Sequence, residues 1–104
     1  MADVSEVSVA QAKALLGEHS NTLILDSRDL ASYKQGCIEG AMMAHEGLIE
    51  SVLNKADKQV PVLVYCYQGN SSMEVATLFS SCGFNTVYRM AGGYAEWKRA
   101  HENN

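Results

Sequence analysis

Hydrophobic residues occur along the chain in two kinds of spacing, short clusters and helical repeats. Unbroken runs at 22–25 and 62–65 indicate buried strands, the β-branched and aromatic residues at 86–90 indicate a further strand, and 38–43 is expected to be a short strand or extended segment. Apolar positions with the helical repeat indicate helices, and these fall at 9–16, 29–35, 48–53, 75–82 and 94–100. Because strands and helices alternate, the pattern predicts an α/β fold with a parallel sheet covered by helices on both faces.

Local signals mark where several of these elements begin and end. Ser8 and Gln11 form a capping box ahead of the first helix. Gly36 is expected to end the second helix in the left-handed conformation, and Gly83 occupies the position of a C-cap after the helix at 75–82. In parallel sheets of this kind ligands bind at the carboxyl ends of the strands, where the pattern places Cys66.

Cys66 begins a tight loop, residues 66–72, between the most hydrophobic strand and the helix that follows it. A strand–loop–helix unit points consecutive backbone N–H groups at one position, which suits an anion. Gly69 and Asn70 tolerate positive φ, so the loop can curl around that position. A thiol held there ionises more readily than a free cysteine. The pattern therefore predicts a nucleophilic Cys66 in an anion cradle, although a small buried cysteine at a strand end with ordinary turn chemistry is the alternative.

Composition narrows the classes of function. The 104 residues suit one domain, 1–104, whose motifs lie within about 5–100. The chain carries 8 Lys and Arg against 12 Asp and Glu, a formal charge of −4, which argues against nucleic acid or an anionic membrane as the main partner. No apolar run approaches the ~18 residues of a membrane span, and the N-terminus lacks the features of a secretory signal. Three cysteines without a close pair do not suggest a disulfide framework, so we expect a cytoplasmic protein.

The loop Cys66-Tyr67-Gln68-Gly69-Asn70-Ser71-Ser72 resembles the active-site loop of the rhodanese family. It is most similar to that of the single-domain bacterial thiosulfate sulfurtransferases of the glycerol-regulon type. Three further stretches resemble family motifs, namely Leu25–Arg28 (Asp-x-Arg), Tyr33–Ala41 (Tyr-x-x-Gly-His-Ile-x-Gly-Ala) and Met90–Trp97 (Gly-Gly-aromatic-x-x-Trp). The four motifs occur in the family's order and run from about residue 23 to residue 97.

This resemblance implies a fold and a reaction. The fold is a single rhodanese-like domain with a central, mostly parallel five-stranded sheet flanked by helices on both faces. The reaction moves the outer sulfur of thiosulfate to cyanide or a thiol through a persulfide on Cys66, by double displacement and without a metal or cofactor. Thioredoxin-like dithiol proteins are acceptors that the family suggests.

We assign roles in the loop by position. Cys66 is the nucleophile and sulfur carrier, and Tyr67 and Gln68 shape the mouth of the site. Gly69 permits the curl, while Asn70, Ser71 and Ser72 offer amides and hydroxyls to the oxyanion, although Ser72 can equally be the N-cap of the next helix. Outside the loop, Asp26 and Arg28 are expected to support the structure near the site rather than to take part in catalysis. Tyr94, Trp97 and Cys82 are expected to pack against the core, and His45 to be a surface or packing residue.

The sequence departs from the family at two points. Cys37 stands where the family usually has histidine, and it is expected to be structural, with a resolving thiol as the alternative. The loop lacks the arginine that many members carry, so anion binding would rest on N–H groups and hydroxyls. That absence also disfavours a cysteine phosphatase or arsenate reductase, whose loops follow Cys-x5-Arg. A relay or sensor module that passes sulfur to a protein would use the same loop and stays open, whereas a catalytically dead scaffold is disfavoured by the intact Cys66.

Overall fold

The computed structural model of the chain describes residues 4–67 and 72–102. Its strands are β1 (Val4–Val7), β2 (Leu23–Asp26), β3 (Met42–Met43), β4 (Val62–Tyr65) and β5 (Val87–Met90). Its helices are α1 (Val9–Glu18), α2 (Leu30–Gln35), α3 (Glu46–Lys55), α4 (Ser72–Ser81) and α5 (Gly93–Glu102). The strands form one sheet in the order β1-β5-β4-β2-β3, and all four neighbouring pairs are parallel.

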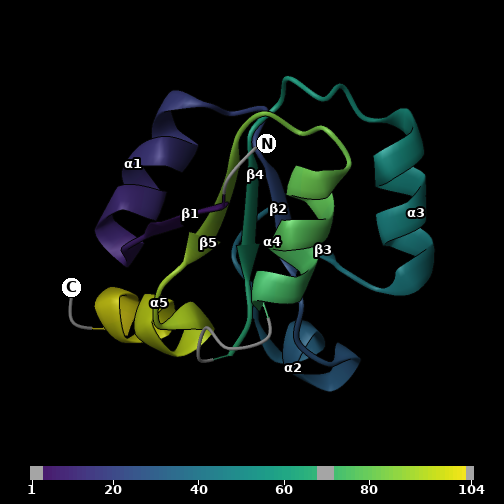
Figure 1. Cartoon of the computed structure of the whole chain (residues 1–104). Coiled ribbons are helices and arrows are strands. Elements are labelled where there is room, and N and C mark those ends of the chain that lie inside the picture. Colours follow the sequence, from purple (N-terminus) through teal and green to yellow (C-terminus); the bar gives the residue numbers. More distant parts are fainter. Residues whose placement is uncertain (1–3, 68–71, 103–104) are drawn as a thin grey trace.

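The helices cover both faces of this sheet, as predicted. Helices α1 and α5 lie on one side, and α3 and α4 lie on the other (Figure 1). The central strand β4 is completely buried because it contributes alternate side chains to two apolar clusters. Leu63 and Tyr65 join the cluster beneath α1 and α5, whereas Val62 and Val64 join the cluster beneath α3 and α4. This arrangement confirms the predicted fold class.

Two strands differ from the pattern read along the chain. Strand β1 was not indicated, because it is an edge strand in which only Val7 is buried and Ser5 and Glu6 are exposed. The run at 38–43 forms a strand only at its last two residues. Ile38 and Ala41 are buried as loop residues instead, so their hydrophobicity reflects packing rather than sheet pairing.

Two predictions about single residues are wrong. Gly36 follows α2 with φ 163° and ψ 140°, which is extended backbone rather than the left-handed cap. Its lack of a side chain serves close packing, since a Cβ there would lie 3.1 Å from the Tyr94 hydroxyl oxygen. Cys82 is exposed, because α4 turns Ala76 and Phe79 toward the core and leaves Cys82 beyond its last turn. Gly83 does follow α4 with positive φ, 99°, as its sequence position indicated.

Candidate active site

Cys66 directly follows the central strand β4 and is only 3% exposed. The first turn of α5 holds the backbone of Cys66 and of the residue that follows it. The Tyr94 N–H donates to the Cys66 carbonyl oxygen at 2.7 Å, and the Ala95 N–H donates to the Tyr67 carbonyl oxygen at 3.1 Å. On the other side, the Ser27 N–H donates to the Tyr65 carbonyl oxygen at 2.9 Å. The backbone around Cys66 is therefore held at the carboxyl edge of the sheet by the first turn of α5 and by the residue that follows β2.

Gly93 is what allows α5 to approach so closely. It has φ +61°, and a Cβ built on it would lie 2.3 Å from the Cys66 carbonyl oxygen and 2.6 Å from the Tyr67 carbonyl oxygen. Both distances are far below van der Waals contact, and both neighbours are backbone atoms that cannot rotate away. The close packing of α5 on the Cys66 segment thus requires glycine at this position.

We expect Gly93→Ala to lower both stability and sulfur transfer. Overpacking combined with strain at positive φ should cost roughly 2 kcal/mol or more and should displace the backbone of Cys66. Urea unfolding and thiosulfate:cyanide turnover would measure the two effects. Gly17→Ala is the matched control, because Gly17 lies within α1 with nothing within 4 Å of a built Cβ. That control should be stabilised by about 0.5–1 kcal/mol, and a Gly93→Ala protein that behaved like it would contradict the close packing.

Beside Cys66, the end of β2 carries a buried ion pair. Asp26 is completely buried, and the Arg28 side chain is 5% exposed. Arg28 Nε donates to Asp26 Oδ1 at 3.0 Å, and Arg28 Nη2 donates to Asp26 Oδ2 at 2.6 Å. The Tyr65 hydroxyl also donates to Asp26 Oδ2, at 2.7 Å, and accepts from the Ile38 N–H at 3.2 Å. Since Arg28 Nη2 reaches the Gly36 carbonyl oxygen at 2.6 Å, the network joins β2, β4 and the end of α2.

The charges of this network are well defined. Burial of the guanidinium works against its charge, but the hydrogen bonds and attraction of Asp26 outweigh that effect and raise the pKa of Arg28 above its ordinary value. Burial, together with the hydrogen bond to Asp26, raises the pKa of Tyr65 well above its ordinary value. Arg28 therefore stays charged and Tyr65 stays a neutral hydrogen-bond donor at physiological pH.

Besides Cys66, the structure describes two residues of the predicted active-site loop, Tyr67 and Ser72. Tyr67 is 58% exposed. Ser72 is completely buried as the first residue of α4, and its Oγ has no hydrogen-bond partner among the described residues, so it makes no capping hydrogen bond. The predictions for Gln68, Gly69, Asn70 and Ser71 fall outside the described residues.

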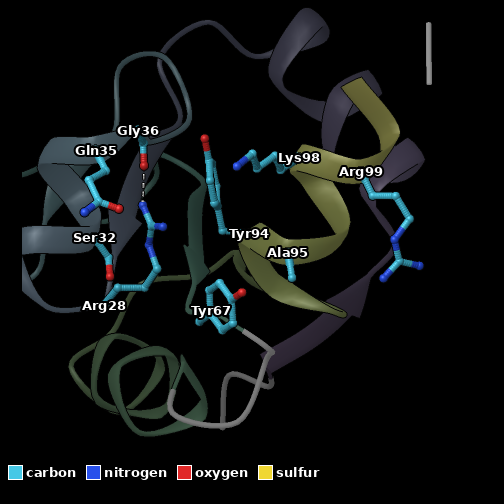
Figure 2. A pocket seen from close by; sticks show the side chains of 9 residues that line it. All are labelled: Arg28, Ser32, Gln35, Gly36, Tyr67, Tyr94, Ala95, Lys98 and Arg99. Carbon is cyan, nitrogen blue, oxygen red and sulfur yellow. Dashed lines mark hydrogen bonds between the residues drawn. The ribbon is translucent and has the colours of Figure 1, made fainter. Parts of the chain in front are cut away.

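A cavity of about 460 Å³ opens between α2 and the first turns of α5 (Figure 2). Arg28 and Tyr94 face each other in it, with the guanidinium carbon 4.2 Å from the ring centroid, and Tyr67 forms another wall. Tyr94 packs against the core cluster beneath α1 and α5, as predicted, and it also lines the cavity together with Lys98, which the sequence did not indicate. The position of Tyr94 directly after Gly92-Gly93, close to the carboxyl end of β5, was the signal that could have placed it near the site.

A rhodanese-like domain model matches residues 8–100. The chain belongs to the rhodanese family. Over 97% of its length it is 33% identical to the thiosulfate sulfurtransferase GlpE of Tolumonas auensis, covering 94% of that protein. It is 42% identical to the thiosulfate sulfurtransferase GlpE of Coxiella burnetii over 76% of this chain and 74% of that protein.

Among solved structures, the Alr3790 protein of Anabaena sp. superposes with a TM-score of 0.78 at 29% identity, covering 90% of this chain and 77% of that one. Within this rhodanese fold, Cys37 is half-buried and packs against the core cluster beneath α1 and α5. His45 is the N-cap of α3, where its Nδ1 accepts from the Leu48 N–H at 3.2 Å. No helix among the described residues is long and apolar enough to cross a membrane.

Proposed function

We propose that this chain is a thiosulfate sulfurtransferase that carries the transferred sulfur as a persulfide on Cys66. The observation that carries the proposal is the place of Cys66, a cysteine at the carboxyl end of the central strand whose backbone is fixed by α5. The GlpE relatives of T. auensis and C. burnetii, which are named for this activity, support the choice of thiosulfate. We also take residues 1–104 to form one rhodanese domain.

The proposed reaction has two displacement steps. The Cys66 thiolate attacks the outer sulfur of thiosulfate, the sulfur–sulfur bond of thiosulfate breaks, and sulfite leaves with the bonding electron pair. Cyanide then attacks the outer sulfur of the persulfide, thiocyanate leaves, and the Cys66 thiolate is restored. Each step needs a positioned sulfur anion and donors for the charge on the leaving group. In this proposal Cys66 is the nucleophile, Tyr67 and Gln68 shape the mouth, Gly69 permits the curl, and Asn70, Ser71 and Ser72 face the oxyanion.

Sulfur uptake tests this function directly. After incubation with thiosulfate, we expect the intact mass of the protein to rise by one sulfur atom, and cyanide should remove that atom as thiocyanate. Peptide mapping should locate the sulfur on Cys66. Cys37→Ser and Cys82→Ser are the matched controls and should both take up sulfur normally. Uptake that disappears in Cys37→Ser, or that maps to another cysteine, would overturn the assignment.

The physiological acceptor belongs to the proposal as well. Three large apolar side chains at the carboxyl edge of the sheet are exposed, namely Leu30 (50%), Tyr67 (58%) and Met73 (45%). Such a surface beside the reactive cysteine favours a protein acceptor, and we propose a thioredoxin-like dithiol protein in the cytoplasm. If sulfur passed at a useful rate only to such a partner, with negligible cyanide turnover, the chain would be a persulfide relay rather than a general sulfurtransferase.

A further inference from the structure

A single residue, Ser27, holds the peptide group that leads into Cys66. It directly follows strand β2, and its backbone N–H donates to the Tyr65 carbonyl oxygen at 2.9 Å. Its side-chain hydroxyl donates to the same oxygen, also at 2.9 Å. The N–H bond continues the parallel pairing of β2 with β4, in which Asp26 lies opposite Tyr65. The hydroxyl bond is additional, because strand pairing uses backbone groups alone.

Two donors on one carbonyl oxygen restrain the peptide plane beside Cys66. The oxygen has two lone pairs and can accept both hydrogen bonds. Since a peptide group is planar, the direction of the Tyr65 carbonyl also sets the positions of the N and Cα atoms of Cys66. On the other side of Cys66, the Tyr94 N–H donates to the Cys66 carbonyl oxygen at 2.7 Å and fixes the next plane. The two planes meet at the Cα of Cys66, so together they set the direction of its side chain.

The role of Ser27 is distinct from that of the charged residues on either side of it. Asp26 and Arg28 form the buried ion pair, and Asp26 accepts from the Tyr65 hydroxyl. Asp26 therefore anchors the side chain of Tyr65, whereas Ser27 anchors its backbone carbonyl. Ser27 also occupies the open position of the Asp-x-Arg stretch, so the motif itself does not specify a hydroxyl there.

We propose that the Ser27 hydroxyl is a positioning group for sulfur transfer, which restrains the peptide plane before Cys66 and thereby directs Cys66 Sγ. The inference rests on the proposed sulfurtransferase function and adds a residue to it. Sγ attacks the outer sulfur of thiosulfate in the first step and is the leaving atom in the second. Displacement at sulfur needs the attacking, central and leaving atoms in line, so both steps depend on the direction of Sγ. Ser27 acts through Tyr65 and Cys66 and needs no contact with either substrate.

Loss of the hydroxyl tests this role against a matched loss elsewhere. We expect Ser27→Ala to lower kcat/KM for thiosulfate and kcat/KM for cyanide by about fivefold each, because the two half-reactions share Cys66 Sγ. Ser27→Thr retains a hydroxyl and should restore both values. Thr22→Val is the control, since the Thr22 hydroxyl donates to the His19 carbonyl oxygen at 2.7 Å, at the opposite end of β2. It should lower the urea midpoint as Ser27→Ala does but leave both values of kcat/KM unchanged.

The kinetic outcomes separate this inference from the function on which it rests. The positioning role is overturned, while the sulfurtransferase function stands, if Ser27→Ala is as fast as the wild type or loses only the thiosulfate value. It is equally overturned if Ser27→Thr is as slow as Ser27→Ala, or if Thr22→Val slows to the same extent. Should Ser27→Ala not fold, Ser27→Val is compared with Ser27→Thr, which has the same shape and differs in the hydroxyl.

A spectroscopic readout decides if the wild-type protein does not turn over thiosulfate, in which case the proposed function fails. The NMR signal of the Cys66 ¹³Cβ reports the conformation at this residue without any substrate. The positioning role then requires that this signal move in Ser27→Ala and keep its wild-type position in Thr22→Val. An unmoved Cys66 signal in Ser27→Ala would show that the hydroxyl does not direct the thiol.

Discussion

Cys66→Ser is expected to abolish thiosulfate:cyanide turnover, with a fall of roughly 10⁴-fold or more to the background rate, the scale seen when a covalent nucleophile is removed. The hydroxyl of serine does not ionise near neutral pH and cannot hold a transferable sulfur, so neither displacement can occur. Steady-state formation of thiocyanate is the measurement. Because Cys66 is 3% exposed and serine is slightly smaller, the folded structure should survive the change, and urea unfolding would establish that.

The contrast with the other two cysteines makes this result specific. Cys82 is exposed and Cys37 is half-buried at a distance in sequence from the loop, so Cys82→Ser and Cys37→Ser should retain turnover. Residual turnover in Cys66→Ser that disappears in the double variant with Cys37→Ser would show that Cys37 carries sulfur. That outcome would replace the single-cysteine mechanism with one that uses two thiols.

Asp26→Asn is expected to destabilise the protein by about 3–5 kcal/mol, the usual cost of removing one partner of a buried ion pair. The substitution preserves size but leaves the charge of Arg28, whose side chain is 5% exposed, without a counter-ion. It also removes the charged acceptor of the Tyr65 hydroxyl. This cost is a large part of the 5–15 kcal/mol that holds a typical domain folded. The shift in the urea midpoint at constant slope would measure it.

An exposed ion pair in the same protein provides the control. Glu6 pairs with Arg89 between the neighbouring strands β1 and β5, and the Glu6 side chain is 57% exposed. Since water already solvates this carboxylate, Glu6→Gln should cost no more than ~1 kcal/mol. If Asp26→Asn cost as little as Glu6→Gln, the buried network would not be what joins β2, β4 and the end of α2.

Much of the fold could be predicted from the sequence because the spacing of apolar residues reflects which side chains are buried. The run Val62–Tyr65 is apolar at every position since β4 is covered on both faces, and this continuity placed Cys66 at the end of a buried strand. The start of α1 could also be predicted, because the capping box of Ser8 and Gln11 involves residues only three positions apart. Four motifs in the family's order indicated the rhodanese family, and the comparisons confirmed it.

Patterns failed where a residue's surroundings come from distant parts of the chain. Strand β1 was missed because an edge strand buries only one side chain here, and its pairing with β5 spans most of the sequence. Gly36 was predicted to adopt a left-handed backbone at the end of α2. Its lack of a side chain instead leaves room for the hydroxyl of Tyr94, a residue far along the chain. Cys82 fits the helical repeat, but the helix ends before it, and the orientation of α4 on the sheet leaves it exposed.

The sequence by itself therefore determined the order of the elements from α1 onward, the family and the position of Cys66 at the end of a buried strand, because each depends on near neighbours in the chain. Only the tertiary structure decided which residues surround that cysteine. Packing of α5 against the carboxyl edge requires Gly93 and places Tyr94 opposite Arg28. The same packing forms the cavity that Arg28, Tyr67 and Tyr94 line, a property that no single segment encodes, because segments far apart in the sequence meet at one edge of the sheet.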